Sequence, residues 1–407
     1  MKKKYYLMKL WQESPLRISS GEGENSDNDL MLDGRGIPYI PGSSLTGVLR
    51  DMLTEDNGNQ LFGTLSQSNH IIISDATLNE DSSKFVISVR DGVGLSDDGV
   101  AEKQKKYDFE TLICENPFFA VLEVDEEGFS VMEKLLKEIG AARGIRVGGR
   151  TTRGYGRLSV EIREHMFTFP QDIMAWMDYD PRSPKSWEIA SPVTLIKKTS
   201  EKNTYIQVEF RLKGSMIIRQ SADYEGINST YLATLKGDSA IIPGTSWAGI
   251  FRHHMRNLAK EVGWTTDRLE EIDSLFGKTP VDSGAKKSDI VFSETCVSGG
   301  KPYSYKRIGV DRFTAAPSVG KLYANEYYQG GKGTLEIEIP RKWTEKWKKQ
   351  ILAACLLDLD RGLLHFGGEG SVGRGVAEIT DLTVNGISRL EGLKSGDIGF
   401  LDEEGDI

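Results

Sequence analysis

The stretch IPGSSLTGVLR at Ile40–Arg50 returns later in the chain as IPGTSWAGIFR at Ile242–Arg252. The two stretches share Ile-Pro-Gly-x-Ser-x-x-Gly-x-x-Arg, position for position. A Leu-Phe-Gly tripeptide follows each copy, and a glycine-rich loop of identical spacing closes each half: GGRTTRGYG at Gly148–Gly156 and GGEGSVGRG at Gly367–Gly375. Sequence motifs that recur in the same order indicate a tandem duplication.

The composition is typical of a soluble globular protein with room for two domains. The chain has 407 residues, of which 38% are hydrophobic and 27% charged, so each half is long enough to bury its own core. No apolar run approaches the length of a membrane span. Cys114, Cys296 and Cys355 have no CxxC spacing, which indicates neither a disulfide framework nor a zinc cluster, and we expect a cytoplasmic protein.

The formal net charge of −9 argues against binding of nucleic acid over the whole surface. It leaves room for a locally basic groove, because the acids are bunched elsewhere, as in the tail at residues 402–406.

Both halves are expected to contain four strands and two helices in the order β-α-β-β-α-β, which is the ferredoxin-like pattern of an α+β protein. The expected strands are Tyr5–Ile18, His70–Leu78, Phe118–Val124 and Arg157–Ile162, then Thr204–Ile218, Asp289–Val297, Gly333–Pro340 and Val376–Val384. The expected helices are Ser44–Leu53, Ser130–Ala142, Thr245–Ala259 and Thr344–Leu364. Ser44 and Thr245 are placed to cap the helix that follows each Pro-Gly turn.

These patterns predict a first domain at residues 1–166 and a second at 204–385. Residues 167–203 hold Pro170, Pro181 and Pro184 with little periodicity, and are expected to form a linker. Residues 386–407 are expected to form an acidic C-terminal tail.

The connection between the second and third strands is unusually long in both halves, at Asn79–Asn116 and Ser298–Lys332. Insertions of this length inside a compact domain are usually functional or disordered. Both combine cations, which suit phosphates, with aromatic rings, which suit bases. A solvated, charged hairpin is the alternative interpretation. The residues concerned include Arg90, Lys105 and Lys106 in the first insertion, and Lys306, Arg307, Arg312 and Phe313 in the second.

Together, these motifs resemble the RAMP superfamily of CRISPR-associated proteins. More narrowly, they are similar to the backbone subunit of type III effector complexes, with two fused copies as in type III-D and related effectors. The resemblance covers Lys2–Glu164 and Thr204–Asp381. Gly92–Leu95 and Gly309–Thr314 match the projecting β-hairpin, or thumb, of that family.

The resemblance implies two tandem RAMP domains that bind guide RNA and target RNA within a complex of other effector subunits, away from membranes. The implied RNA contacts lie in the Pro-Gly turns and helices, the thumbs and the glycine-rich loops. Besides the thumb residues above, they are Ser43, Ser44, Arg50, Gly148, Gly149, Arg150, Arg153, Thr245, Ser246, Arg252, Gly367, Gly368 and Arg374. For Arg50 and Arg252, a salt bridge to a neighbouring side chain is the alternative.

The resemblance also implies that target RNA is cut by an aspartate in the loop before the first Pro-Gly turn. Attack by the ribose 2′-hydroxyl would depend on a divalent metal, Mg²⁺ or Mn²⁺. Counting back from the turn places Asp27 on the first acid of the family pattern, as catalytic residue and metal ligand, and Asp33 on the second. Asp29 stands in place of a proline, and both Asp29 and Asp33 remain candidates. An acidic loop with a turn at Asp33-Gly34 is the structural alternative.

The second half lacks an acid at the position that corresponds to Asp27, which the same count places near Ser229. Asp223 lies six residues upstream and is the remaining candidate there. We therefore expect cleavage beside the first copy only.

Two other functions remain open. The first alternative is a structural RNA-binding subunit without cleavage. The second is a guide-processing endonuclease that uses His253 or His254 as a general base. A histidine in the second role needs a positioned partner.

Overall fold

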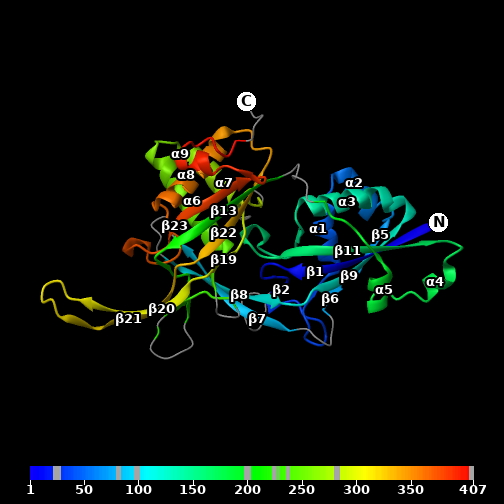
Figure 1. Ribbon diagram of the computed structural model, residues 1–407, viewed down its shortest axis with the longest axis horizontal. Coiled ribbons are helices and arrows are strands. Elements are labelled where there is room, and N and C mark those ends of the chain that lie inside the picture. The colour runs from blue at the N-terminus through cyan, green and yellow to red at the C-terminus, as the bar shows by residue number, and fades with distance from the viewer. Residues whose placement is uncertain are drawn as a thin grey trace. The chain divides into compact units, whose positions relative to one another are not determined.

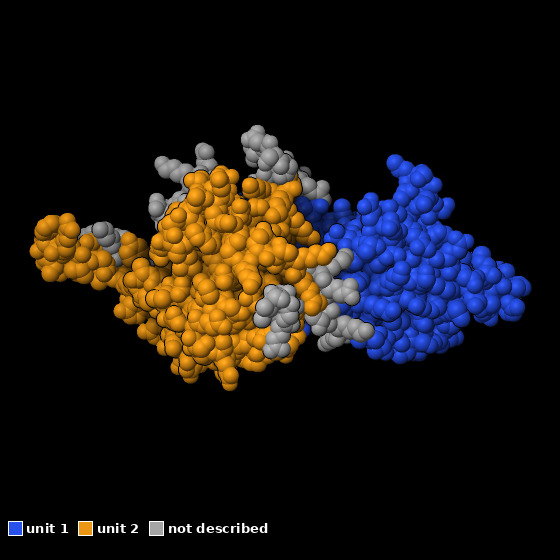
Figure 2. All heavy atoms as spheres, turned by 90° about the horizontal axis from the view of Figure 1, so that it is seen from above, with its two compact units in different colours: residues 1–151, 155–200 blue, residues 152–154, 201–407 orange. Residues whose placement is uncertain are grey.

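The computed structural model describes residues 1–21, 29–78, 84–95, 101–196, 203–221, 227, 229–234, 239–278 and 285–402, except for the side chains at 20–21, 95, 101–106, 221 and 319–321. The chain forms two compact units, which Figure 2 colours separately. Unit 1 comprises residues 1–151 and 155–200, and unit 2 comprises residues 152–154 and 201–407. Among the described residues, no helix is both long and apolar enough to cross a membrane.

Unit 1 is built on an antiparallel sheet in the order β10-β11-β1-β9-β6-β4 (Figure 1). The last long strand lies beside the first, and the first beside the third, as in a ferredoxin-like domain. The strands are β1 (Lys2–Gln12), β4 (Tyr39–Ile40), β5 (Ile71–Ile73), β6 (Ala76–Thr77), β9 (Phe118–Asp125), β10 (Ile145–Arg146), β11 (Arg157–Thr168) and β12 (Ser191–Pro192). The helices are α1 (Gly42–Asp51), α2 (Glu55–Phe62) and α3 (Phe129–Ala141).

Unit 2 repeats this arrangement in the order β17-β19-β22-β13-β23-β24. Its strands are β13 (Asn203–Lys213), β17 (Ala240–Ile242), β18 (Val291–Phe292), β19 (Thr295–Ser298), β22 (Lys332–Pro340), β23 (Val376–Val384) and β24 (Ile387–Ser388). Its helices are α6 (Gly244–Glu261), α7 (Thr266–Leu275), α8 (Lys346–Arg361) and α9 (Leu390–Ser395). The predicted tandem ferredoxin-like fold is confirmed.

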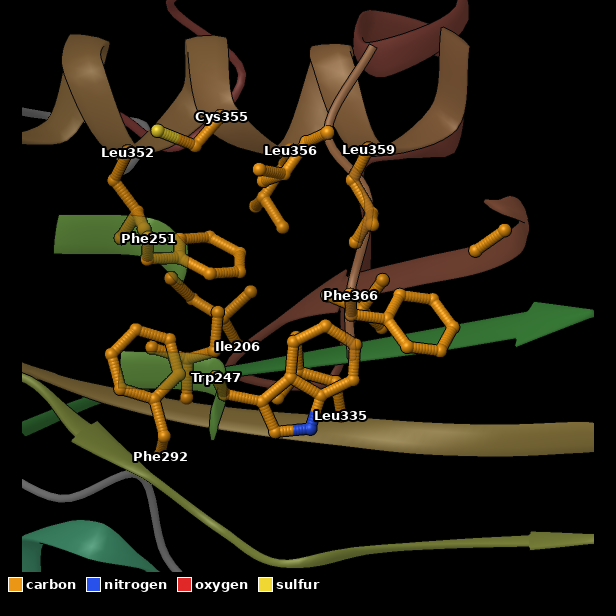
Figure 3. Close-up of a cluster of buried hydrophobic side chains, with 14 of the residues drawn as sticks. Ile206, Trp247, Phe251, Phe292, Leu335, Leu352, Cys355, Leu356, Leu359 and Phe366 are labelled. Carbon is orange, nitrogen blue, oxygen red and sulfur yellow. The ribbon is translucent and has the colours of Figure 1, made fainter. Parts of the chain in front are cut away.

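The core of unit 2 lies between the sheet and helices α6 and α8 (Figure 3). Trp247, Phe251 and Leu335 are fully buried there, and the Trp247 indole N–H donates to Thr295 Oγ1 at 3.0 Å. Burial of such large side chains stabilises a fold by roughly 2–3 kcal/mol each. The repeated apolar positions of the motif thus assemble one core per unit.

The first strand of unit 1 is buried on both faces. Tyr6, Met8 and Leu10 pack into the main core, whereas Tyr5 and Leu7 belong to a separate cluster on the opposite face. That second cluster includes side chains from residues 167–190, where α4 (Ile173–Met177) and α5 (Pro184–Ile189) form. Much of the segment expected to be an irregular linker is therefore packed structure.

The residues expected to form an acidic tail also differ in part from that description. Helix α9 forms, and Leu393, Phe400 and Leu401 are buried in the core of unit 2. Their apolar side chains bury well although acids flank them, which composition alone did not reveal.

Each Pro-Gly turn leads directly into a helix, but the expected caps are wrong. Helix α1 begins at Gly42, two residues earlier than predicted, and Ser44 lies inside it. The Gly42 N–H donates instead to Asp75 Oδ1 at 2.7 Å, so an acid from the end of the second strand region satisfies the helix terminus. Gly42 has no room for a side chain, because an added Cβ would lie 2.8 Å from the carbonyl oxygen of Ile73.

Both long insertions fold as β-hairpins. In unit 1, β7 (Phe85–Leu95) pairs with β8 (Ala101–Cys114). In unit 2, β20 (Lys301–Val310) pairs with β21 (Pro317–Gln329) and extends as an arm from the body of the unit (Figures 1 and 2). At its root, β21 joins β14 (Ser215–Met216), β15 (Arg219–Ser221) and β16 (Ser229–Tyr231) in a second sheet.

Candidate nucleic-acid interface

The second hairpin presents rings and a cation on one face of its outer strand. Alternation along β20 places Tyr303, Tyr305 and Arg307 on the same side. The two tyrosine rings are stacked with centroids 6.3 Å apart, and the guanidinium of Arg307 lies 5.6 Å from the Tyr305 ring. Both rings are 44% exposed, which is unusual for large aromatic side chains and suits stacking with a base.

The tip of this hairpin is held by Asp311. Its Oδ1 accepts from the N–H groups of Phe313 at 3.0 Å and Thr314 at 2.8 Å, and these bonds lower the pKa of the Asp311 carboxyl. The turn presents Phe313, 83% exposed, with the Arg312 guanidinium 5.0 Å from its ring. The predicted thumb residues Arg312 and Phe313 therefore share one ordered, exposed tip, and Lys306 is exposed along the strand.

A carboxylate that the sequence analysis missed lies at the root of this hairpin. Glu369 is only 11% exposed. It accepts hydrogen bonds from β21, from β15 and from its own loop, and it forms an ion pair with Arg307 of β20. The donors are Arg374 Nε (3.0 Å), Arg219 Nη2 (3.3 Å), the Tyr327 hydroxyl (3.1 Å) and Asn325 Nδ2 (3.1 Å), and the ion pair with Arg307 Nη2 is 2.9 Å long. We call these six residues the Glu369 cluster.

The Glu369 cluster keeps a net positive charge, because three guanidinium groups face one carboxylate. Burial alone would raise the pKa of Glu369, but the hydrogen bond from Arg374 and the charge of Arg307 outweigh it, and the pKa lies below its ordinary value. The Arg374 guanidinium also lies 3.5 Å from the Tyr327 ring centroid. Arg307 is thus tied into the body of unit 2.

The two glycine-rich loops make matching main-chain hydrogen bonds. The Gly149 N–H donates to the Arg17 carbonyl at 2.7 Å, and the Gly368 N–H donates to the Ile217 carbonyl at 2.8 Å. This pairing identifies Arg17 and Ile217 as corresponding positions in the two units.

The residue after each glycine pair adopts a left-handed backbone although it is not glycine. Arg150 has φ 58° and Glu369 has φ 63°. Such a conformation is uncommon outside Gly, Asn and Asp. Each loop can approach its neighbour closely because glycine has no Cβ. An added Cβ at Gly148 would lie 2.1 Å from the Arg17 carbonyl oxygen, and one at Gly367 would lie 2.5 Å from the Ile217 carbonyl oxygen.

In unit 1, the predicted residue Arg150 stacks on the returning hairpin strand. Its guanidinium lies 4.5 Å from the Tyr107 ring and 4.4 Å from the Phe109 ring, and its Nη1 donates to the Tyr107 hydroxyl at 2.9 Å. Arg90 is 6% exposed and donates to the Tyr155 hydroxyl at 3.3 Å, so it supports the hairpin root. The side chains of Lys105 and Lys106 lie outside the described residues.

The repeated motif arginines both have intramolecular partners. Arg50 donates to the Gly63 carbonyl at 3.2 Å and to Asn59 Oδ1. Arg252 donates to Asp273 Oδ1 at 2.8 Å. Each guanidinium therefore ties the first helix of its unit to the second helix, and Arg50 also contacts the glycine of Leu-Phe-Gly. Arg252 forms the salt bridge that was the alternative, whereas Arg50 forms hydrogen bonds. These contacts do not test binding to RNA.

The remaining predicted contacts lie near the starts of α1 and α6 and in the first glycine-rich loop. Ser43, Ser44, Thr245 and Ser246 occupy the first turns of these helices. Arg153 groups with unit 2, where its Nη2 donates to the Phe276 carbonyl at 2.5 Å.

The acidic loop of unit 1 is described only in part. Asp27 lies outside the described residues. Asp29 begins the two-residue strand β3 (Asp29–Leu30), which pairs with β2 (Ser19–Gly21). The Leu30 N–H donates to Glu110 Oε2 at 2.9 Å, so a hairpin carboxylate lies beside this strand.

Asp33 organises a turn. Its Oδ1 accepts from the N–H groups of Arg35 and Ile37, both at 2.9 Å, and its Oδ2 pairs with the Arg35 guanidinium at 2.9 Å. The hydrogen bond from Ile37, followed by that from Arg35, lowers the pKa of Asp33. Both carboxylate oxygens therefore have partners within the turn.

The strand register moves the correspondence between the two loops by one residue. The Met31 N–H donates to the Ile18 carbonyl and the Leu232 N–H to the Ile218 carbonyl, both at 2.8 Å. Counted from this register, Asp27 corresponds to Asn228 rather than to Ser229. No acid occupies either position, so the predicted difference between the copies does not depend on the count. Asp223 lies outside the described residues.

The two neighbouring histidines have partners on the helical layer. His254 Nε2 lies 2.6 Å from Asp358 Oδ2, with side-chain exposures of 18% and 17%. His253 Nε2 lies 3.1 Å from Asn257 Nδ2. The partner that a catalytic histidine needs is present for His254, but it joins α6 to α8, and neither helix carries hairpin or glycine-loop residues.

Within the described part of the chain, no group of three or more His, Cys, Asp or Glu side chains is arranged to hold a metal ion. Asp29 and Glu110 are nevertheless carboxylates at the edge of the acidic loop. Mg²⁺ usually takes one or two protein carboxylates together with substrate phosphates. The donor chemistry at this loop is therefore of the kind that a divalent cation takes.

Comparison with known proteins gives one family. The RAMP superfamily profile matches residues 13–159 and 227–378. No curated protein matches the chain. Among solved structures, a chain in the cryo-EM structure of the type III-B Cmr-beta bound to cognate target RNA is similar, with 18% identity and a TM-score of 0.35 over 41% of this chain. The similarity covers 61% of that solved chain.

The two matched regions together span more than half of the sequence, and one falls on each ferredoxin-like repeat with its hairpin and glycine-rich loop. The chain belongs to the RAMP superfamily.

Proposed function

We propose that this protein is a backbone subunit of a type III CRISPR effector complex that binds guide RNA and cleaves complementary target RNA beside unit 1. The observation that carries the proposal is the second hairpin, an exposed arm with two stacked tyrosines and an aromatic tip, rooted in a cationic cluster. Stacking rings beside phosphate-binding cations are what a single strand requires.

The two units would occupy successive positions along the guide. In each, a side chain of the glycine-rich loop contacts the hairpin root, Arg150 in unit 1 and Glu369 in unit 2. Binding would come largely from neutralisation of phosphates, so the affinity would fall as salt rises. The hairpins would press into the guide–target duplex and displace a nucleotide at a regular interval.

Cleavage would use the acidic loop of unit 1. Asp27 is the first candidate for orienting the 2′-hydroxyl and holding the ion, with Asp29 next. Asp33 ranks behind both, because the turn and Arg35 already engage its two oxygens. A bound Mg²⁺ or Mn²⁺ would offset the charge that develops on the attacked phosphate. Asp29 and Glu110 would contribute carboxylates on the described side of the loop.

The test is to purify the chain with its complex and sequence the RNA that accompanies it. A guide with a repeat-derived end is expected. Asp27→Ala should then abolish one cut in guide-complementary RNA and leave RNA binding within about twofold. Excess chelator should abolish the same cut. His254→Asn is the control, expected to cut at the normal position.

The alternative is a purely structural subunit of the same complex. It is favoured by one observation, that Asp33 and its neighbours form an internally bonded turn. Unchanged products with Asp27→Ala, Asp29→Ala and Asp33→Ala would establish this alternative. RNA cutting by the isolated chain, lost with His254→Asn, would instead point to a guide-processing enzyme.

A further inference from the structure

We propose that unit 1 contains a phosphate-binding site formed by Arg17 and Arg150, and that unit 2 has lost the corresponding site. The identification of its ligand as an RNA phosphodiester rests on the proposed function. The site itself follows from the geometry of the two guanidinium groups.

The two guanidinium groups share one aromatic platform. Arg17 lies 4.8 Å and Arg150 4.4 Å from the Phe109 ring centroid. Arg150 is fixed further by its hydrogen bond to the Tyr107 hydroxyl. Stacking orients a guanidinium while its N–H edges stay able to donate, which favours planar, two-point recognition of an oxyanion.

The described residues provide no carboxylate for this pair. Neither Arg17 nor Arg150 makes an ion pair or hydrogen bond with an acid within the described ranges, and Arg17 Nε is buried without a hydrogen-bond partner. Burial lowers the pKa of Arg17, and the like charge of Arg150 lowers it further. Two adjacent cations with an orphaned buried donor are stabilised by an anion.

The backbone holds the two residues together. The Gly149 N–H donates to the Arg17 carbonyl, and Arg150 follows in the left-handed conformation. Gly148 permits this close approach, because an added Cβ would overlap the Arg17 carbonyl oxygen at 2.1 Å. The pair is therefore built into the fold rather than assembled by chance on a mobile surface.

Unit 2 keeps the backbone and changes the chemistry. Ile217 stands where Arg17 stands, and Glu369 stands where Arg150 stands. The carboxylate of Glu369 takes the place that an external anion would fill and pairs with the arginines around it, although the cluster keeps a net positive charge. An anion site at this position is therefore expected in unit 1 alone.

We propose a phosphodiester as the ligand, because its two unesterified oxygens can each accept from a guanidinium group. The platform also lies on β8, the returning strand of the first hairpin, where RNA would pass in the proposed function.

The experiment compares Arg17→Gln, Arg150→Gln and the double variant with the parent in the full chain. Arg182→Gln is the matched control, an exposed arginine of unit 1 outside the site. The salt dependence of binding to a short oligouridylate should lose about 0.7 from its logarithmic slope in the double variant, as expected for one phosphate contact with a single strand. Arg17→Lys keeps the charge and should retain most of the salt-dependence slope of the parent.

A second measurement uses inorganic phosphate at constant ionic strength. Phosphate should raise the Tm of the parent and of Arg182→Gln, and the rise should disappear in Arg150→Gln, whose side chain lies at a surface turn. This arm decides the site even if the chain binds no RNA. Slopes and phosphate shifts equal to those of the parent would overturn the proposal. If the parent binds RNA, a phosphate shift that is lost without any change in RNA slope would leave an adventitious ion only and overturn the proposal as well.

Discussion

Glu369 and Arg150 occupy the same left-handed backbone position in the two units and carry opposite charges. Glu369 collects arginines from three directions, whereas Arg150 stacks on Tyr107 and Phe109. One backbone geometry thus supports two ways of anchoring a hairpin, by ion pairs in unit 2 and by cation–ring stacking in unit 1.

Glu369→Gln tests the anchoring in unit 2. The amide keeps the shape but removes the charge, so three guanidinium groups face one another with little compensation. We expect a loss of about 2 kcal/mol in unfolding free energy, the order found for hydrogen bonds to charged groups, measured by urea denaturation at pH 7. Glu378→Gln is the control, because that acid pairs with Arg211 on an exposed surface and should cost much less.

The effect of Glu369→Gln should depend on pH in one direction. The pKa of Glu369 is lowered from its ordinary 4.5, so its charge stabilises the fold above pH 4.5 and ceases to do so as the pH falls through the folded-state value. The difference between parent and variant should therefore shrink below pH 4.5. A difference that is constant from pH 7 to pH 3.5 would show that packing, rather than charge, explains the loss.

At the scale of single elements, the second hairpin combines a buried root with an exposed arm. Tyr327 and Tyr328 are fully buried in unit 2, whereas every described side chain from Lys301 to Lys306 is exposed. The root therefore belongs to the core and the arm does not.

Replacement of residues 306–324 by an Asn-Gly turn tests this division. Tyr305 and Asn325 form a register pair, so the shortened strands can still close a hairpin. We expect binding of single-stranded RNA to weaken by at least tenfold at fixed salt, while the chain stays folded by circular dichroism. Loss of Arg307 will reduce the Tm by a few degrees. The same truncation with unchanged RNA affinity would contradict the role of the arm.

The sequence predicted the elements that carry strong periodicity. Strand Gly333–Pro340 and helix Ser130–Ala142 agree with β22 and α3 to within a residue. Helices α2 and α7 were missed, because EDNGNQLF and TDRLEEIDSL are mostly polar and bury only a few side chains each. Long insertions were recognised by length, and their pairing as hairpins follows the family pattern.

The residues of the site could be predicted only where they belong to a sequence motif. Arg150 and Arg374 stood out as arginines among glycines, whereas Glu369 gave no signal, because its partners are 5 to 150 residues away in the sequence. The role of Arg17 likewise follows only from the structure, in which Arg17 and Arg150 both stack on Phe109. Contacts between distant segments are the part that periodicity and spacing do not encode.

At the scale of the whole molecule, the chain has two separate main cores, one in each unit. Leu122 and Leu335 lie on corresponding strands, β9 and β22, and both are fully buried. Replacing either by Ala should cost about 2–5 kcal/mol in its own unit. Calorimetry is expected to show two transitions, with Leu122→Ala lowering one midpoint and Leu335→Ala the other. A single transition that both variants shift equally would show that the units unfold together.

The exposed arm has a consequence for the behaviour of the free chain in solution. Among the described strands, β20 pairs only with β21, so its outer edge is open to strand addition by another molecule. The arm also exposes the aromatic side chains of Tyr303, Tyr305 and Phe313, which favour association between copies. The positive charges of Lys306 and Arg312 oppose this association. The cations that would attract RNA thus also keep neighbouring copies apart, and neutralising them is expected to lower the solubility of the free chain.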